Sequence, residues 1–152
     1  MGEKLIERLK GHKRIALDTP VLIYHVEGVE PYASLTAALF DWAGREGISL
    51  VLSFLIWTEI LVKPIADGKG EAVRRIEGFL REIPLAEWLP LDEAIAREAA
   101  RIRGIYGLRT PDAIIAATAV VGGATALVTN DREMRKVEGE GIKVFVLEDF
   151  VR

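Results

Sequence analysis

Short apolar runs that alternate with helical segments constrain the fold of this chain most strongly. Each run is brief, and the segments between the runs place apolar residues at helical spacing. The expected strands cover residues 14–18, 48–53, 86–91, 124–129 and 142–147. Because helices lie between successive strands, we expect a mainly parallel central sheet with helices on both faces, a three-layer α/β/α fold.

The expected helices divide the rest of the chain without leaving a linker. They cover residues 3–10, a segment opening at Thr19-Pro20, and residues 31–45, 54–65, 71–83, 92–106, 110–121 and 132–137. Pro64 is expected to strain or end its helix. The 152 residues suit one core and show no internal repeat, so we expect a single domain, 1–152, with residues 1–13 as a short N-terminal helical extension.

Composition excludes several kinds of protein. The chain has no cysteine, which rules out disulfides, zinc–thiolate sites and cysteine nucleophiles and is typical of a reducing cytoplasm. Its longest apolar stretch is shorter than the roughly 20 residues of a membrane helix, so we expect a cytoplasmic protein with no membrane contact. The net charge of −3 gives no overall attraction to nucleic acid, which would have to bind through a local basic patch or a metal ion.

Four acidic residues occupy positions where parallel α/β sheets bind ligands, at the carboxyl ends of the strands. Asp18 closes the first expected strand, and Asp131 follows the fourth by two residues. Asp112 is the only charge in the helix after Thr110-Pro111. Glu59 lies in the helix after the second strand, among apolar residues. The four acids are therefore expected to converge on one edge of the sheet.

Each acid also has a structural explanation on its own. Asp18 and Asp131 suit turns or helix caps, Asp112 complements the positive end of its helix, and Glu59 can be the solvent-facing residue of its helix. These explanations do not account for the convergence. Clustered carboxylates raise one another's pKa, and a divalent cation offsets their repulsion. Oxygen ligands favour Mg²⁺ or Mn²⁺.

Other catalytic motifs are missing from the sequence. There is no GxGxxG or GxxxxGK[ST] motif, and Asp18-Thr19-Pro20 lacks the second aspartate of the aspartyl-phosphate phosphatases. The two histidines, His12 and His25, have no partner at metal-ligand spacing. The three tryptophans are interpreted as core residues.

Four segments resemble, in order and spacing, the motif blocks of the PIN-domain nucleases, and most closely those of the VapC-type toxin ribonucleases. They are ALDTPVLIY, LSFLIWTEI, RTPDAIIAATA and ALVTNDREM, and the resemblance extends over about residues 14–149. Two features depart from the short toxins of the family. The first aspartate comes later in the chain, and Met134 stands where an aromatic residue is common.

The resemblance implies a Mg²⁺- or Mn²⁺-dependent ribonuclease that hydrolyses RNA phosphodiester bonds and leaves a 5′-phosphate and a 3′-hydroxyl. In such a two-metal mechanism, with ions about 3.5–4 Å apart, Asp18, Asp112 and Asp131 would hold one ion. Glu59 would help to hold a second or orient the attacking water. Thr19 and Thr129 would support the carboxylates. The family also implies a homodimer and a cognate antitoxin protein.

Basic residues flank the third and fourth blocks and are candidates for RNA phosphate contacts, although a solvated charged surface explains each one alone. They are Arg109, Arg132, Arg135 and Lys136. Two alternatives to a toxin remain open: a free-standing PIN nuclease in RNA processing, and a non-catalytic binding or assembly module. A partner groove for the module, or for an antitoxin, would use apolar residues of the 31–45 and 54–65 helices, namely Leu35, Leu39, Ile56, Ile60 and Leu61. A flap-type DNA nuclease fits less well, because that class is longer and has a DNA-gripping helical motif not found here.

Overall fold

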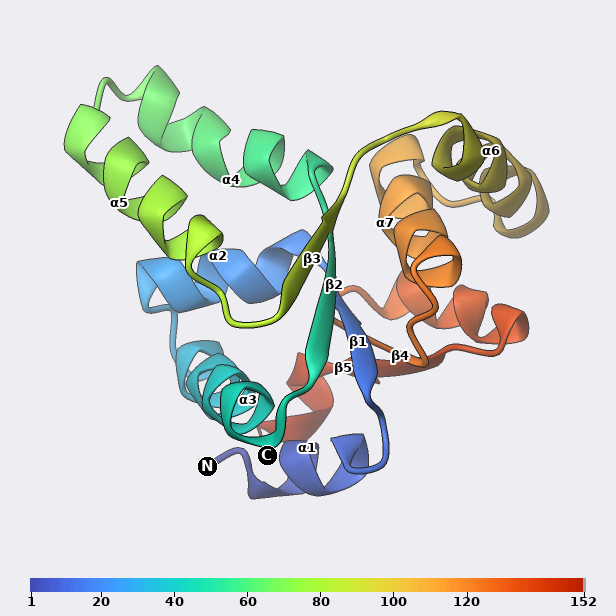
Figure 1. Ribbon diagram of the computed structural model, residues 1–152, viewed down its shortest axis with the longest axis horizontal. Coiled ribbons are helices and arrows are strands. Elements are labelled where there is room, and N and C mark those ends of the chain that lie inside the picture. The colour runs from blue at the N-terminus through green and yellow to red at the C-terminus, as the bar shows by residue number, and fades with distance from the viewer. Residues whose placement is uncertain (152) are drawn as a thin grey trace.

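The computed structural model describes residues 1–151, and its centre is a five-stranded sheet in which every paired strand is parallel to its neighbour (Figure 1). The strands are β1 (Arg14–Leu17), β2 (Ser49–Ser53), β3 (Ala86–Leu89), β4 (Ala126–Thr129) and β5 (Lys143–Val146). Their order across the sheet is β3-β2-β1-β4-β5. The parallel sheet expected from the sequence is confirmed.

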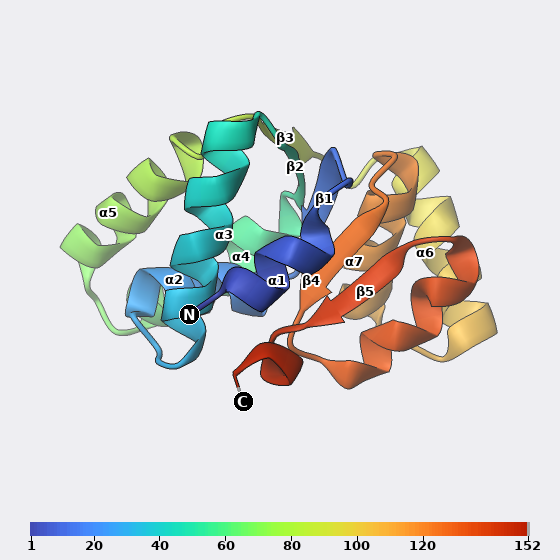
Figure 2. The same cartoon turned by 90° about the horizontal axis from the view of Figure 1, so that it is seen from below.

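The helices form a layer on each side of this sheet. They are α1 (Glu3–Leu9), α2 (Thr19–Glu27), α3 (Tyr32–Glu46), α4 (Leu55–Ala66), α5 (Gly70–Arg81), α6 (Glu93–Tyr106), α7 (Thr110–Val121) and the 3₁₀ segments η1 (Arg132–Glu140) and η2 (Leu147–Phe150). Figures 1 and 2 show α1 to α5 on one side and α6, α7 and η1 on the other. The three-layer α/β/α architecture is therefore confirmed.

Burial on both faces explains the apolar sequences of the central strands. Every residue of β4 and all but the first of β1 and β2 are buried. Helix α7 covers β1 and β2 on one face, and seven of its residues are buried. A sheet covered on both faces needs continuous rather than alternating hydrophobic residues, as these strands have.

Helix α1 is packed into the core. Leu5 and Leu9 have no exposed surface, and the helix contacts α3. The segment expected as an extension thus contributes two leucines to the hydrophobic core that the sheet and the other helices share.

Helices α4 and α5 form a hairpin that projects beyond the sheet (Figure 1). Pro64 does not end α4, which continues to Ala66. Pro64 lies in the last turn of α4, so the hydrogen bond that it cannot donate is lost near the end of the helix and not in its middle. No helix within residues 1–151 is long and apolar enough to span a membrane.

The strand order places a topological switch point between β1 and β4. From β1 the chain moves to β2 and β3 on one side and later returns to β4 on the other. Open parallel sheets bind ligands in the crevice that this reversal creates at the carboxyl ends of the two strands. Asp18 follows β1 directly, and Asp131 follows β4 by two residues, so both lie at this crevice.

Candidate active site

Asp18 lies at the centre of the candidate site. Its backbone N–H donates to the carbonyl of Val128, which extends the pairing of β1 with β4 by one residue. Only 4% of Asp18 is exposed. Its Oδ1 accepts a hydrogen bond of 2.8 Å from the backbone N–H of Thr19, so Asp18 caps α2. Its Oδ2 accepts one of 2.7 Å from the Thr129 hydroxyl.

The surroundings of Asp18 favour its protonated form. Burial raises the pKa of Asp18 to about 6, against the lowering effect of the hydrogen bonds from Thr129 and Thr19. The negative charges of Asp112 and Glu59 make smaller contributions to this rise. The fold thus brings Glu59 of α4 and Asp112 of α7 within electrostatic reach of Asp18.

Glu59 is tied to Asp18 through one residue. Its Oε1 accepts a hydrogen bond of 2.5 Å from the Thr19 hydroxyl. Thr19 therefore contacts Asp18 with its backbone N–H and Glu59 with its side chain. The solvent-facing role considered for Glu59 is wrong, because the residue is partly buried and faces α2.

Asp112 stands in the first turn of α7, and its side chain is 15% exposed. Its Oδ2 accepts a hydrogen bond of 3.2 Å from Arg109 Nε. The carboxylate therefore has two electrostatic partners in addition to its acidic neighbours: the positive end of its helix and the guanidinium group.

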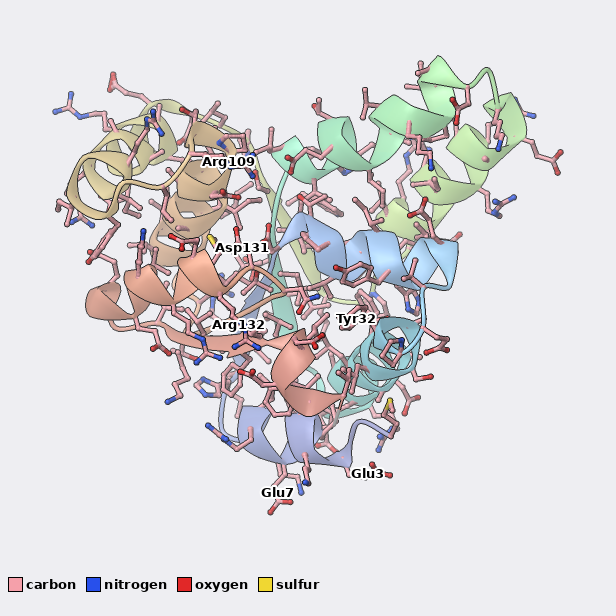
Figure 3. The ribbon with its side chains drawn as sticks, turned by 180° about the vertical axis from the view of Figure 1, so that it is seen from behind. Glu3, Glu7, Tyr32, Arg109, Asp131 and Arg132 are labelled. Carbon is pink, nitrogen blue, oxygen red and sulfur yellow. The ribbon has the colours of Figure 1, made fainter. Side chains whose placement is uncertain are left out.

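Asp131 is joined to the other acids through Thr129. Its backbone N–H donates to the Thr129 hydroxyl over 3.0 Å, and that hydroxyl donates in turn to Asp18. The Asp131 carboxylate accepts a hydrogen bond of 2.9 Å from the N–H of Glu133 and so caps η1. Figure 3 shows Asp131 in the middle of the molecule, with Arg109 at the start of α7 above it.

The donor set fits a hard divalent cation by its chemistry. All four candidate ligands are carboxylates, as Mg²⁺ and Mn²⁺ prefer. Each oxygen of Asp18 accepts only one hydrogen bond, which leaves lone pairs for an ion. In residues 1–151 no three Asp, Glu or His side chains stand at metal-binding spacing. Binding by these residues would thus require side-chain movement, most of all at Asp131, whose carboxylate caps η1.

The basic residues expected to contact RNA are all engaged in ion pairs. Arg132 and Arg135 both pair with Asp149, and Lys136 pairs with Glu133. Arg109 pairs with Asp112, as described above. All four side chains are exposed, so a phosphate at these positions would compete with a carboxylate partner.

Asn130 is a residue that the sequence reasoning missed. Its Nδ2 donates to the Tyr24 hydroxyl over 3.1 Å, and its Oδ1 accepts from the backbone N–H of Glu148 over 2.9 Å. The Tyr24 ring stacks on Tyr32 at 4.6 Å. These contacts link the loop before Asp131 to α2, α3 and η2. In the sequence, an asparagine after a strand indicates only a turn, and its distant partners leave no local signal.

The candidate site is thus a group of carboxylates at the switch point of a parallel sheet. Such a site defines a class of α/β proteins with an acidic functional site. The chain belongs to the PIN domain family, because the model of that domain matches residues 15–140. This match confirms the resemblance seen in the sequence. No curated protein sequence matches the chain significantly.

Solved structures from toxin–antitoxin systems have a similar fold. A chain of a toxin–antitoxin complex from Klebsiella pneumoniae is 24% identical, with a TM-score of 0.67 over 88% of this chain and 97% of that one. A chain of FitAcB from Neisseria gonorrhoeae is 23% identical, with a TM-score of 0.67 over 88% and 98%. A VapBC-family toxin–antitoxin structure from Mycobacterium tuberculosis is 20% identical, with a TM-score of 0.58 over 88% and 98%. At these identities the likeness establishes the fold.

Proposed function

We propose that this protein is a Mg²⁺- or Mn²⁺-dependent endoribonuclease and the toxin of a toxin–antitoxin pair. The observation that carries the proposal is the environment of Asp18. A buried carboxylate whose pKa is raised to about 6, mainly by burial and less by Asp112 and Glu59, is costly unless a cation or proton offsets its charge. A perturbed acid in a ligand-binding crevice is typical of a functional site.

The residues have distinct roles in this proposal. Asp18, Asp112 and Asp131 hold one divalent ion, and Glu59 holds a second or orients the attacking water. Thr19 and Thr129 fix the side chains of Glu59 and Asp18 through their hydroxyls. When bound, the ions would supply an activated water and stabilise the charge that develops on the phosphate and the leaving oxygen.

Ionisation of Asp18 limits the pH at which this site can work. A metal ligand must be deprotonated, and Asp18, with its pKa of about 6, is largely ionised only above that pH. Ion binding at a lower pH must displace the proton. We therefore expect cleavage activity to fall as the pH drops below about 6.

The proposal of an antitoxin partner is supported by the toxin–antitoxin assemblies named above. The proposal of a homodimer rests on the family resemblance. A partner also needs a surface, and four of the five residues first considered for this purpose are wrong, whereas Leu61 is partly exposed beside Val62 and Ile65. Leu35, Leu39, Ile56 and Ile60 are buried in the core of this chain. The exposed apolar side chains of α4 are instead Val62 and Ile65, each 60% exposed. In the alternative proposal of a binding module, Val62 and Ile65 would again form the contact surface.

Cleavage of RNA by matched variants tests the enzyme. Purified wild type with Mg²⁺ or Mn²⁺ should cut single-stranded RNA, and chelation by EDTA should stop the reaction. Asp112→Asn removes one carboxylate charge and should abolish cleavage. Asp41→Asn makes the same chemical change at an exposed ion pair on α3 and should cleave normally. Equal cleavage by wild type and Asp112→Asn would refute the proposed site.

A further inference from the structure

A cavity of about 520 Å³ lies between α2, α4 and α5 and has Glu59 in its wall. Its volume falls in the range of small-molecule sites. Since Glu59 also accepts the hydrogen bond from Thr19, the cavity opens directly beside the candidate active site. No role has been given to it so far.

The cavity extends away from the active site along α4. Glu59, Lys63 and Asp67 all line it and are four residues apart, so they follow one face of the helix. Eight residues of helix span about 12 Å. The cavity therefore runs from the catalytic acids toward the tip of the α4–α5 hairpin (Figure 1).

Three exposed cations line this cavity and have no acidic partner. They are Lys63 of α4, Lys69 at the start of α5 and Arg75 of α5. Within residues 1–151 none of them makes an ion pair. Arg109, Arg132 and Arg135 are all paired. A phosphate can bind the cavity cations without displacing a carboxylate.

The rest of the lining suits an unpaired base. Ile23, Val26 and Pro64 are partly exposed and provide apolar surface, against which the flat face of a base can pack once it leaves its stack. Three acids, Glu27, Glu59 and Asp67, balance the three cations in number. Because the charges balance, the cavity does not attract anions in general, and binding requires contacts to both base and phosphate.

We propose that this cavity binds the unpaired nucleotide next to the cleaved bond, with its base on Ile23, Val26 and Pro64 and its phosphates at Lys63 and Arg75. This inference rests on the proposed ribonuclease function and adds the place where the strand lies beside the candidate active site.

Binding of a short fluorescein-labelled single-stranded RNA of mixed sequence tests the phosphate contacts. Every protein in this binding assay also carries Asp112→Asn, so that the RNA is not cleaved. Lys63→Gln and Arg75→Gln should each weaken binding about threefold or more at low salt and reduce the slope of log K against log salt by about 0.7. Arg97→Gln is the matched control, because Arg97 is exposed and lies on α6, away from the cavity. Equal affinities for all three variants would overturn the proposal.

A second variant tests whether RNA binding needs the open volume of the cavity, without changing the charge of its lining. Ala72 lines the cavity on α5, and Ala72→Trp should fill it and weaken RNA binding. Ala96→Trp on α6 places the same side chain on an exposed helical position as a control. Circular dichroism checks that both variants are folded. Undiminished RNA binding by folded Ala72→Trp would show that the cavity does not hold the base.

Cleavage assays separate this inference from the function on which it rests. Suppose that wild type cleaves RNA, that Asp112→Asn does not, and that all three cavity variants cleave normally. The cavity assignment is then wrong, and the proposed ribonuclease function stands. If wild type cleaves no RNA, both fail. If the cavity variants bind RNA normally but lose a protein partner, the cavity belongs to that partner and the RNA assignment is overturned.

Discussion

The β1–β4 edge and the α4–α5 hairpin differ in how far their side chains are buried and paired. At the edge, Asp18 and Thr129 are buried, and each has hydrogen-bond partners. On the hairpin, Lys63 is exposed without an ion pair within the described residues, and Val62 and Ile65 remain in solvent. The polar groups at the edge thus bond to one another, whereas side chains of the hairpin are available for contacts with other molecules. In the functions proposed above, the edge is the reaction site and the hairpin the recognition surface.

The two regions should also respond differently to substitution. A buried carboxylate and its donors form a connected network, in which loss of one member leaves another unsatisfied. Exposed side chains on a helix usually change stability by no more than about 0.5 kcal/mol. Large effects on activity and stability are therefore expected at the edge and small ones on the hairpin.

The largest effect is expected for Asp18→Asn. Activity should fall more than about 100-fold, since loss even of a residue that only supports a metal ligand costs about that much. The metal-free variant should nevertheless be more stable than wild type at pH 8, by about 2–3 kcal/mol, because the folded protein no longer buries a charge. Urea unfolding in EDTA measures this gain.

The pH dependence of that gain follows from the raised pKa of Asp18. Above about pH 6 the carboxyl is ionised in both the folded and unfolded states, and the cost of burying its charge is fully present. Between pH 6 and its ordinary value of 3.8, the folded protein takes up the proton first, so this cost disappears. The stability difference between the variant and wild type should therefore shrink as the pH falls. A difference that stays constant from pH 8 to pH 4 would contradict a charge effect. Mg²⁺ or Mn²⁺ should stabilise wild type and not the variant.

A smaller effect is expected for Thr129→Val. This change removes the donor to Asp18 and the acceptor for the Asp131 N–H while keeping the side-chain shape. We expect a loss of about 10–100-fold in kcat, with little change in KM, and about 1–3 kcal/mol in stability.

Thr118→Val is the matched control for this change. Thr118 is equally buried, but its hydroxyl donates only to the carbonyl of Ile114 in its own helix. If both variants lost activity to the same degree, the special role of Thr129 would be refuted.

The smallest effect on the protomer is expected for Ile65→Glu on the hairpin. Stability and intrinsic cleavage should stay close to those of wild type, because Ile65 is exposed. Self-association, measured by sedimentation velocity, should weaken if the apolar surface of α4 pairs two copies. Val121→Glu, at an exposed apolar position on α7, is the control. A large loss of protomer stability in Ile65→Glu would remove the contrast between the two regions.

The sequence predicted the sheet well because its signal is local. Each strand is a short apolar run, and each begins or ends near a residue that favours a turn or helix cap, such as Asp18 after β1 and Asp92 before α6. Element ends were less accurate. Helix α4 passes Pro64, and the segment after Asp131 is a longer 3₁₀ turn than the helix predicted for residues 132–137. Proline preferences alone do not tell where a helix's last turn falls.

The structure brings Asp112 and Glu59 within electrostatic reach of Asp18 and joins Asp131 to Asp18 through Thr129. The rule for the carboxyl ends of strands predicted that these acids lie at one edge of the sheet. It did not indicate that Thr129 would join Asp18 to Asp131, or that Asn130 would contact Tyr24, because these partners are far apart in the chain. Whether Leu35 or Val62 faces solvent likewise depends on how helices pack, and apolar residues on two sides of α3 and α4 left that open.

The position of β1 in the middle of the sheet has a consequence for synthesis of the protein on the ribosome. β1 pairs with β2 early in the chain, but its other neighbour, β4, begins only at Ala126. A nascent chain therefore carries Asp18 and Glu59 long before Asp131 and the Thr129 hydroxyl emerge. A partly made chain would lack Asp112 and Asp131, so in the proposed function the protein would become able to cleave RNA only when translation is nearly finished.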